Sequence, residues 1–342
     1  MIRFRREAIA VTADIEQMFY CFRVREKDRD FLRFLWFENN DLSKAIADYR
    51  MNVHVFGNSP SPAVAIHGLH KSVQGNEFHV DPDVQHFVLH DFYVDDGLKS
   101  LPTVQAAISL LKRTQDVLSK SNLRLHKIAA NNQEVMDAFP SSDHASDLKD
   151  LDLDADALPL QRSLGLDWNL KTDCFLLMSP VRPSPTHGGC LVHNQQPHDP
   201  LGFVAPVIVQ GKAILRELTV EKGDWDVPLP PAMEDAWTSW RASLSELAEL
   251  SIPRRYTEAS PSAAVRRELC VFCDASVKAI GAVCYLKVTD SNGTNQIGFV
   301  MGKAKLAPRP EHTVPRLELC AAVLAVELAD LVLAELDLQI DA

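Results

Sequence analysis

The sequence lacks any apolar run of the roughly 18–20 residues that a membrane-spanning helix needs. Its N-terminus, Met1 to Arg6, is basic but lacks the apolar core and the small-residue cleavage site of a secretory signal. We therefore expect an intracellular protein, in the cytoplasm or the nucleus, with no membrane partner. With 342 residues, 46% of them hydrophobic, the chain can bury substantial cores and is expected to form two or three domains.

The sequence also lacks a complete set of paired cysteines. Its seven cysteines are an odd number, which together with the missing signal predicts free thiols. Cys270 and Cys273 have the CxxC spacing, but no second pair accompanies them, and their odd separation in a strand turns the two sulfurs to opposite faces. We therefore do not expect zinc there. The histidines and the cysteine between residues 187 and 198 follow no hydrophobic period, and we interpret them as incidental.

An excess of positive charge is missing as well, because the formal net charge is −11. Nucleic-acid binding usually requires a basic surface. The acids are concentrated, however, and the segment 143–156 is interpreted as a solvated acidic connection, whereas residues 1–50 carry ten basic and nine acidic side chains. Five basic residues near the N-terminus form either a local basic groove or an ordinary exposed face: Arg23, Arg25, Lys27, Arg29 and Arg33.

Two adjacent acids, Asp95 and Asp96, follow an apolar run. The residues 88–94 are strand-like and Gly97 ends the run, so the acids are expected where a hairpin turns. Neighbouring side chains in a strand point to opposite faces, so one aspartate can enter a cleft while the other braces the turn or reaches a second ion. The simpler alternative is an exposed Asp-Asp-Gly turn, which is common in hairpins.

A further acid, Asp14, follows the β-branched run that begins at Ile9. Two strand ends can therefore present three carboxylates to one site. Two-metal phosphoryl transfer uses such acids to hold ions roughly 3.5–4 Å apart, one activating the attacking oxygen and one stabilising the leaving oxygen. We predict a metal site made of Asp14, Asp95 and Asp96. The alternative is an unrelated metal phosphohydrolase, which would cleave phosphoesters without a nucleic-acid template.

The same motifs resemble those of reverse transcriptases. Tyr93-Val94-Asp95-Asp96 is similar to their signature hairpin, and Asp14 with Phe19 is similar to their first palm motif. The stretch 55–60 resembles the template-side motif between them. The wider sequence resembles the polyprotein of BEL/Pao-type LTR retrotransposons. Three stretches carry this likeness: residues 49–62, 122–127 and 199–203.

The resemblance implies an α+β fold with a palm-type sheet and the activity of an RNA-directed DNA polymerase. Its partners would be an RNA or DNA template-primer and a deoxynucleoside triphosphate, together with other parts of the retroelement polyprotein. It implies two magnesium ions held by Asp14, Asp95 and Asp96. Because Asp14 lies so close to Met1, we expect most of the fingers subdomain to be missing and the activity to be weak or absent. The alternative is an inactive nucleic-acid-binding or protein-interaction remnant.

The resemblance also implies roles for residues around the acids. Phe19 would lie under the sugar of the incoming nucleotide and exclude a 2′-hydroxyl, or else it is a core aromatic residue. Tyr93 would contact the substrate, and Lys127 would lie near the leaving pyrophosphate unless it is merely solvated. The turn at residues 163–166 would grip the primer, or it is an ordinary hairpin. His54-Val55 stands where many retroviral enzymes have Gln-Gly, so the nucleotide contacts there remain open.

A second acid pattern lies near the C-terminus. Asp274 ends a strand-like run, another strand follows, and a helix is predicted to begin near Pro315 with Glu318 in its first turn. By position alone Glu318 is a capping-type acid. The pattern resembles the opening half of a ribonuclease H domain, in which Asp274 and Glu318 would be the first two metal ligands. The later aspartates of that family do not follow before Ala342, so we do not expect complete ribonuclease H activity.

The chain is predicted to have three parts: a palm (1–135), an acidic linker with a thumb or connection region (136–265), and a truncated ribonuclease H-like α/β domain (266–342). Within them, helices are predicted at 60–72, at 103–121 and through most of 200–252, and strands are predicted near 9–14, 123–128, 164–168, 269–273 and 281–288. Trp225, Trp237 and Trp240 are expected to anchor a helical core. A compensated frameshift is predicted between residues 186 and 198, where the text departs from the family pattern.

Overall fold

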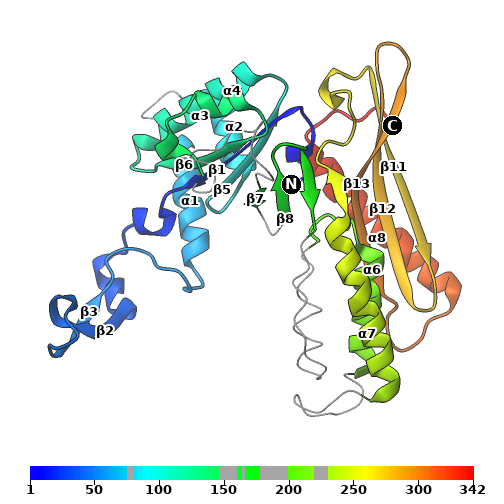
Figure 1. Ribbon diagram of the computed structural model, residues 1–342, viewed down its shortest axis with the longest axis horizontal. Helices are drawn as coiled ribbons and strands as arrows, with labels where there is room; N and C mark the ends of the chain where they lie inside the picture. The colour runs from blue at the N-terminus through cyan, green and yellow to red at the C-terminus, as the bar shows by residue number, and fades with distance from the viewer. Residues whose placement is uncertain (75–79, 146–159, 164–165, 178–198, 219–229) are drawn as a thin grey trace. The chain divides into compact units, whose positions relative to one another are not determined.

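The computed structural model describes residues 1–74, 80–145, 160–163, 166–177, 199–218 and 230–342 (Figure 1). The predicted frameshift segment, Trp225, most of the acidic connection and half of the primer-grip turn (164 and 165) lie outside these residues. The chain divides into two compact units. One unit contains the described residues of 9–99 and 103–145, and we name it the polymerase-like unit only because the motifs that resemble a polymerase lie in it. The C-terminal unit contains 1–8, 100–102 and the described residues from 160 onward. The predicted mixture of helices and sheets is confirmed.

The polymerase-like unit is built on a four-stranded sheet in the order β4-β5-β1-β6. Its strands are β1 (Ile9–Ile15), β4 (Phe92–Tyr93), β5 (Asp96–Leu101) and β6 (Leu125–Ala130). Its helices are α1 (Ser61–Gln74), α2 (Pro82–His90), α3 (Val104–Ser119) and α4 (Gln133–Asp137). Helix α3 packs on β1 and β6, and α2 packs beside β4. The helices predicted at 60–72 and 103–121 are confirmed, as are the strands near 9–14 and 123–128.

Capping side chains explain where these helices begin. Thr103 accepts a hydrogen bond from the amide of Ala106 at the start of α3, and Asp81 accepts one from the amide of Asp83 at the start of α2. The prediction of a strand through residues 88–94 was wrong in its first part, because Val88 lies in α2. An Asp-Pro pair at 81 and 82 starts that helix, and its apolar face buries Val88 in the core.

A protruding hairpin in the same unit follows the short 3-10 helix Glu26–Leu32. Strand β2 (Arg33–Phe37) pairs with β3 (Ile46–Arg50) in the antiparallel sense, and their side chains are mostly exposed. Across the hairpin the rings of Phe34 and Tyr49 stack at 5.8 Å. Ion pairs with Asp30 and Asp48 partly neutralise the guanidinium group of Arg33, one of the five basic residues predicted to form a groove or an exposed face.

The C-terminal unit contains two sheets. The smaller has the order β10-β9-β8-β7, with β7 (Leu160–Ser163), β8 (Leu166–Asn169), β9 (Cys174–Leu176) and β10 (Ser251–Pro253). The larger has the order β11-β12-β13, all antiparallel, with β11 (Arg266–Ala275), β12 (Ala279–Thr289) and β13 (Asn295–Leu306). Figure 1 shows the long helix α8 (Val314–Leu336) lying along this larger sheet.

Alternation along β12 explains why α8 covers one face of the larger sheet. Every second residue from Ile280 to Val288 is buried, and these side chains form one apolar cluster with Leu317, Leu324 and Leu328 of α8. Glu318 was predicted in the first turn of this helix, but α8 already begins at Val314, so the first turn contains no acidic residue. Glu318 is therefore an exposed side chain of the second turn.

Two further helices, α6 (Ala205–Leu218) and α7 (Pro231–Glu246), confirm the predicted helical character of 200–252 within the described residues. Trp237 and Trp240 are buried between them, with ring centroids 4.9 Å apart, as predicted. The loop before α6 touches β13 backbone to backbone. Gly202 has a φ of +78°, and a Cβ atom on it would meet the carbonyl oxygen of Gly302, so only glycine fits there.

A buried arginine binds the first eight residues of the chain to the rest of the C-terminal unit. The Arg254 side chain is fully buried, and its guanidinium group makes a bidentate ion pair with Asp173 at 2.7 and 2.8 Å. The same group donates to the backbone carbonyl of Glu7 at 2.8 Å. Arg5 makes a second link between the same two segments, because its Nε donates a hydrogen bond to the Arg254 carbonyl oxygen at 2.7 Å. A buried guanidinium is stable only when such partners satisfy it.

Candidate active site

The predicted hairpin turn at the paired acids is confirmed. In the β4–β5 hairpin Tyr93 pairs with Asp96 and Phe92 pairs with Gly97, which leaves Val94 and Asp95 as a two-residue loop. Loops of this length favour turns in which the first central residue has a positive φ. Val94 has a φ of +58°, a conformation that a β-branched residue adopts only under strain. The hairpin therefore holds the two acids at its tip at some cost in backbone energy.

The structure brings Asp14 to the same end of the sheet. The backbone N–H of Ile15, the residue after Asp14, donates to the carbonyl oxygen of Asp95 at 3.1 Å. Burial raises the pKa of Asp95, and the nearby Asp14 carboxylate raises it further. Burial, with the charges of Asp95 and Asp14, raises the pKa of Asp96 to about 6. The three acids therefore repel one another through space, which is the condition that attracts a cation.

A basic side chain already lies in this group of acids. The Lys127 ammonium donates to Asp14 Oδ2 at 2.9 Å. This hydrogen bond and the charges of Asp14, Asp95 and Asp96 raise the pKa of Lys127. The sequence predicted Lys127 near a leaving pyrophosphate, or else solvated. Lys127 lies beside the acids, and its role near a leaving pyrophosphate stays a prediction.

A β-bulge explains how Lys127 reaches Asp14. Strand β6 pairs with β1 at Thr12↔Ala129 and at Asp14↔His126, so β6 has one extra residue between these two pairs. Lys127 lies in the bulge with a φ of +48°. Bulges turn a side chain away from its regular alternation. As a result His126, whose Nε2 lies 3.2 Å from Asp14 Oδ1, and its neighbour Lys127 both contact one carboxylate.

The donor set suits a hard divalent cation, because carboxylate oxygens are the ligands that magnesium prefers. Burial first, and then the neighbouring carboxylates, raises the pKa values of Asp95 and Asp96, so a cation that neutralises these groups would be favoured here. Among the residues that the structure describes, however, no three His, Cys, Asp or Glu side chains converge closely enough to hold a metal ion. The acids fit the ion in chemistry and charge, and a metal ion at Asp14 would have to displace His126 and Lys127, which contact its two carboxylate oxygens.

The two predicted aromatic contacts lie in different environments. Phe19, in the 3-10 helix Met18–Cys21, is buried and packs edge-to-face on Phe56 at 4.7 Å. This contact joins the first motif to the template-side motif, and it is compatible with either role predicted for Phe19. Tyr93 is 66% exposed on the hairpin.

Sequence reasoning did not find the contact between His126 and Asp14. The two residues are 112 positions apart, and nothing in the alternation of β6 marks the side chain as functional. The only signal was the strand that the sequence predicts after Asn122. Pairing of that strand with β1 would have placed His126 opposite Asp14.

The second acid pattern is only partly assembled. Asp274, at the end of β11, lines a pocket on the larger sheet, and its side chain is exposed. Glu318 is not among the residues that line this pocket. The role of the two acids as joint metal ligands therefore stays a prediction.

The comparisons with known proteins agree with part of the sequence interpretation. Residues 189–342 match the family model described as a Pao retrotransposon-like RNaseH-like domain. This match confirms the predicted likeness to Pao-type retrotransposons for the C-terminal part of the chain, and it supports a retroelement-derived protein with a nucleic-acid-related function. No curated protein matches the chain.

A likeness in fold extends over nearly the whole chain. The structure is similar to that of a foamy viral protease-reverse transcriptase, solved in complex with double-stranded DNA, with a TM-score of 0.57 and 13% sequence identity. The match covers 98% of this chain and 49% of that chain, so the protein spans about half the length of this relative. At this identity the likeness describes the fold. The polymerase activity is a separate question.

Proposed function

We propose that the polymerase-like unit is the palm of a retroelement RNA-directed DNA polymerase, which transfers a nucleotide to the 3′ end of a primer. The observation that carries this proposal is geometric: the β4–β5 hairpin carries Asp95 and Asp96, and its Asp95 carbonyl accepts a hydrogen bond from the residue after Asp14, so the acids of two strands lie at one end of a four-stranded sheet. The match of residues 189–342 to a retroelement domain family supports it, because polymerase and ribonuclease H-like parts of retroelements are expected in one polyprotein.

Asp14, Asp95 and Asp96 would hold two magnesium ions. When bound, the ions supply activation of the primer 3′-hydroxyl and neutralisation of the leaving pyrophosphate. The protein supplies the fixed frame: the β4–β5 loop carries Asp95, and the backbone hydrogen bond from Ile15 ties that loop to β1. Binding of a cation also relieves the repulsion that raises the pKa values of Asp95 and Asp96.

The neighbouring side chains would bind and orient the substrate. The primer 3′-hydroxyl oxygen attacks the α-phosphorus of a deoxynucleoside triphosphate, the bond to pyrophosphate breaks, and the hydroxyl proton passes to solvent. Once its ammonium group is released from Asp14, Lys127 would form an ion pair with the leaving pyrophosphate. Phe19, held by Phe56, would bound the space beneath the sugar, and the exposed Tyr93 ring would contact the primer. The foamy viral relative was solved with double-stranded DNA, which supports a nucleic-acid duplex as the partner.

Primer extension tests this proposal. The full chain is incubated with magnesium, a primed RNA template and deoxynucleoside triphosphates. Weak incorporation is expected, together with its loss in Asp95→Asn. The control is Asp116→Asn, which alters an exposed carboxylate on α3 and is expected to retain the incorporation of the unmodified chain. No incorporation by the unmodified chain, or equal incorporation by Asp95→Asn, would contradict the proposal.

One observation favours a second candidate, an inactive nucleic-acid-binding remnant. Both carboxylate oxygens of Asp14 are engaged, one by His126 and one by Lys127, so a fixed cation already occupies part of the site. This candidate predicts a mobility shift of template-primer in gels without any synthesis. Asp95→Asn would then leave the binding unchanged.

For the C-terminal unit we propose that Asp274 and Glu318 are remnants of a ribonuclease H-type metal site. Two acids without further ligands are expected to bind magnesium weakly. Degradation of an RNA–DNA hybrid by the full chain, abolished by Asp274→Asn, would show that the site is complete after all.

A further inference from the structure

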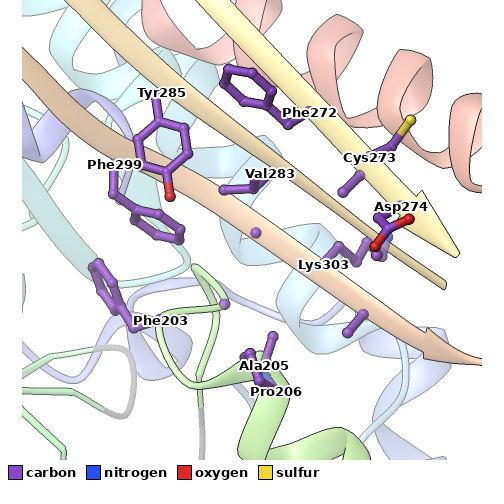
Figure 2. Close-up of a pocket in the computed structure, with 15 residues that line it drawn as sticks. Phe203, Ala205, Pro206, Phe272, Cys273, Asp274, Val283, Tyr285, Phe299 and Lys303 are labelled. Carbon is purple, nitrogen blue, oxygen red and sulfur yellow. The ribbon is translucent and has the colours of Figure 1, made fainter. Parts of the chain in front are cut away.

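A pocket of about 490 Å³ lies on the larger sheet of the C-terminal unit, beside the start of α6 (Figure 2). Its volume lies within the range of ~300–1,000 Å³ that small-molecule sites occupy. The pocket is on the sheet face that α8 leaves uncovered, because Gly281, Val283 and Tyr285 line it while the alternate residues of β12 pack on α8. It is therefore separate from the acids of the polymerase-like unit.

The floor of the pocket is flat because small residues form it. Gly281 and Ala304 are opposite each other on β12 and β13, and Val283 is opposite Gly302. The close approach of Gly202 to Gly302 fixes the loop before α6 against this floor, so that Phe203 forms one wall. A planar ligand can lie on such a surface without meeting a projecting side chain.

One end of the pocket is aromatic. The Tyr285 ring packs edge-to-face on Phe272 at 6.2 Å and on Phe299 at 5.8 Å, and Phe203 lies tilted on Phe299 at 5.2 Å. Phe272 is 60% exposed, so much of its surface is available for contact. Exposed rings on a sheet are the surfaces on which nucleobases stack, at about 1–3 kcal/mol for each base.

The other end is polar, and Figure 2 shows Asp274 there, away from the rings. Asp274 Oδ1 accepts a hydrogen bond from the Ala275 amide. Its Oδ2 makes no hydrogen bond within the described part of the chain, so it can accept one from a ligand. A carboxylate accepts hydrogen bonds from the amino and ring N–H groups of a planar heterocycle.

We propose that this pocket binds a nucleobase, with its ring against the aromatic end and its hydrogen-bonding edge toward Asp274. A nucleobase combines a planar aromatic ring with donors and acceptors on one edge, which is the combination that the two ends require. An aliphatic chain would leave the polar end unused, and a metal ion would leave the aromatic end unused. The base belongs either to a free nucleotide or to a single-stranded nucleic acid. The proposal does not depend on polymerase activity.

Alkylation of a thiol placed on the pocket floor by Val283→Cys measures the occupancy of the pocket, because Val283 lies on the pocket face of β12, whereas Cys273 pairs with Ala282 and its thiol lies on the α8 face. The full Val283→Cys chain is treated with N-ethylmaleimide, and modification of each cysteine is followed by peptide mass spectrometry. The additions are guanosine, adenosine, cytidine and uridine monophosphates, a single-stranded oligonucleotide, and ribose 5-phosphate, which has no base. A base-bearing ligand at ~10 times its Kd is expected to slow the reaction of the introduced thiol about tenfold. Ribose 5-phosphate is expected to have no effect, and Cys21, in the other unit, serves as the internal reference.

Two variants and one control, each made in the Val283→Cys chain, separate the pocket from other effects. Tyr285→Leu and Asp274→Asn are expected to lose the protection, and Ile297→Ala, an exposed residue of the same strand pair outside the pocket, is expected to keep it. If Tyr285→Leu fails to fold, Asp274→Asn decides, because Asp274 is exposed. Protection by the oligonucleotide alone identifies a polynucleotide as the source of the base, and protection by monophosphates identifies free nucleotides. Equal alkylation rates with and without all base-bearing ligands, or equal protection by ribose 5-phosphate, would overturn the proposal.

Discussion

The Lys127 ammonium and the Asp14 carboxylate are joined by a 2.9 Å hydrogen bond between residues 113 positions apart. A single bulged residue with a left-handed backbone makes this contact, and it places a positive charge among the three acids that are proposed to hold metal. Lys127 and a divalent cation therefore compete for Asp14.

Lys127→Met removes this competitor. We expect magnesium binding to tighten by roughly 1 kcal/mol, about fivefold in Kd, because Asp14 no longer has to leave an ion pair. The measurement is the dependence of the melting temperature on magnesium concentration. Lys44→Met, in an exposed turn of the hairpin, is the matched control and is expected to change nothing. Weaker magnesium binding in Lys127→Met would show that the lysine assists the site.

Asp96 gives a prediction for pH. Its pKa in the folded protein is about 6, above the ordinary value of 3.8. Between these two values the folded state binds the proton and the unfolded state does not, so the free energy of unfolding falls as pH rises from about 4 to about 6. Above pH 6 the charged group destabilises the fold by its full amount, roughly 1–2 kcal/mol after allowance for solvent screening.

Asp96→Asn should therefore raise the free energy of unfolding at pH 7 by that amount, and the gain should vanish below about pH 4, where Asp96 is protonated in both states. Urea unfolding at pH 7, 5 and 3.5 provides the measurement. Asp116→Asn, which changes an exposed carboxylate on α3, is expected to show no such pH-dependent gain. A gain that is constant over all three pH values would contradict this explanation.

Val94→Gly tests the strain in the β4–β5 loop. Glycine adopts a positive φ freely, so the substitution should raise the free energy of unfolding by about 1 kcal/mol despite the greater entropy of the unfolded chain. The same change at Val265, an exposed valine just before β11, should lower it by roughly 0.5–1 kcal/mol. Thermal unfolding of both variants compares the two signs, and destabilisation by Val94→Gly would mean that the loop carries little strain.

Arg254→Met is expected to destabilise the C-terminal unit by about 3–5 kcal/mol, because Asp173 is left without its partner and the carbonyls of Phe4 and Glu7 lose a donor. Arg255→Met is the matched control, since that side chain donates to an exposed carbonyl of Glu258, and its cost should stay below ~1 kcal/mol. Urea unfolding followed by tryptophan fluorescence makes the comparison. Equal effects would indicate that the buried network contributes little.

Much of the fold follows from local signals in the sequence. The period of apolar residues places α3, the proline at 315 places the start of α8 to within one residue, and the turn before Gly97 is found from its residue types. The strand predicted through 88–94 failed because β-branched and aromatic residues also fill a buried helix face, so composition alone did not separate the two.

The site could be predicted only as a set of acids. The side chains of Asp14, Asp95 and Asp96 come from strand ends that the sequence identifies, and their order resembles a known family. The contacts of His126 and Lys127 depend on a bulge whose positive-φ residue is not a glycine, and no residue type marks such a position. The join between the first eight residues and Arg254 is also non-local, and hydrophobic periodicity carries no information about it.

That join has a consequence for any attempt to dissect the protein. Because Met1–Ala8 belong with the C-terminal unit while Asp14 belongs with the polymerase-like unit, an expression clone that starts a few codons downstream would spare the acids and damage the opposite half of the molecule. A fragment that begins near Asp199 would likewise lack the peptide that covers Arg254. Loss of function in such shortened products would result from the missing contact between residues 1–8 and Arg254, and it would not show that a catalytic group is missing.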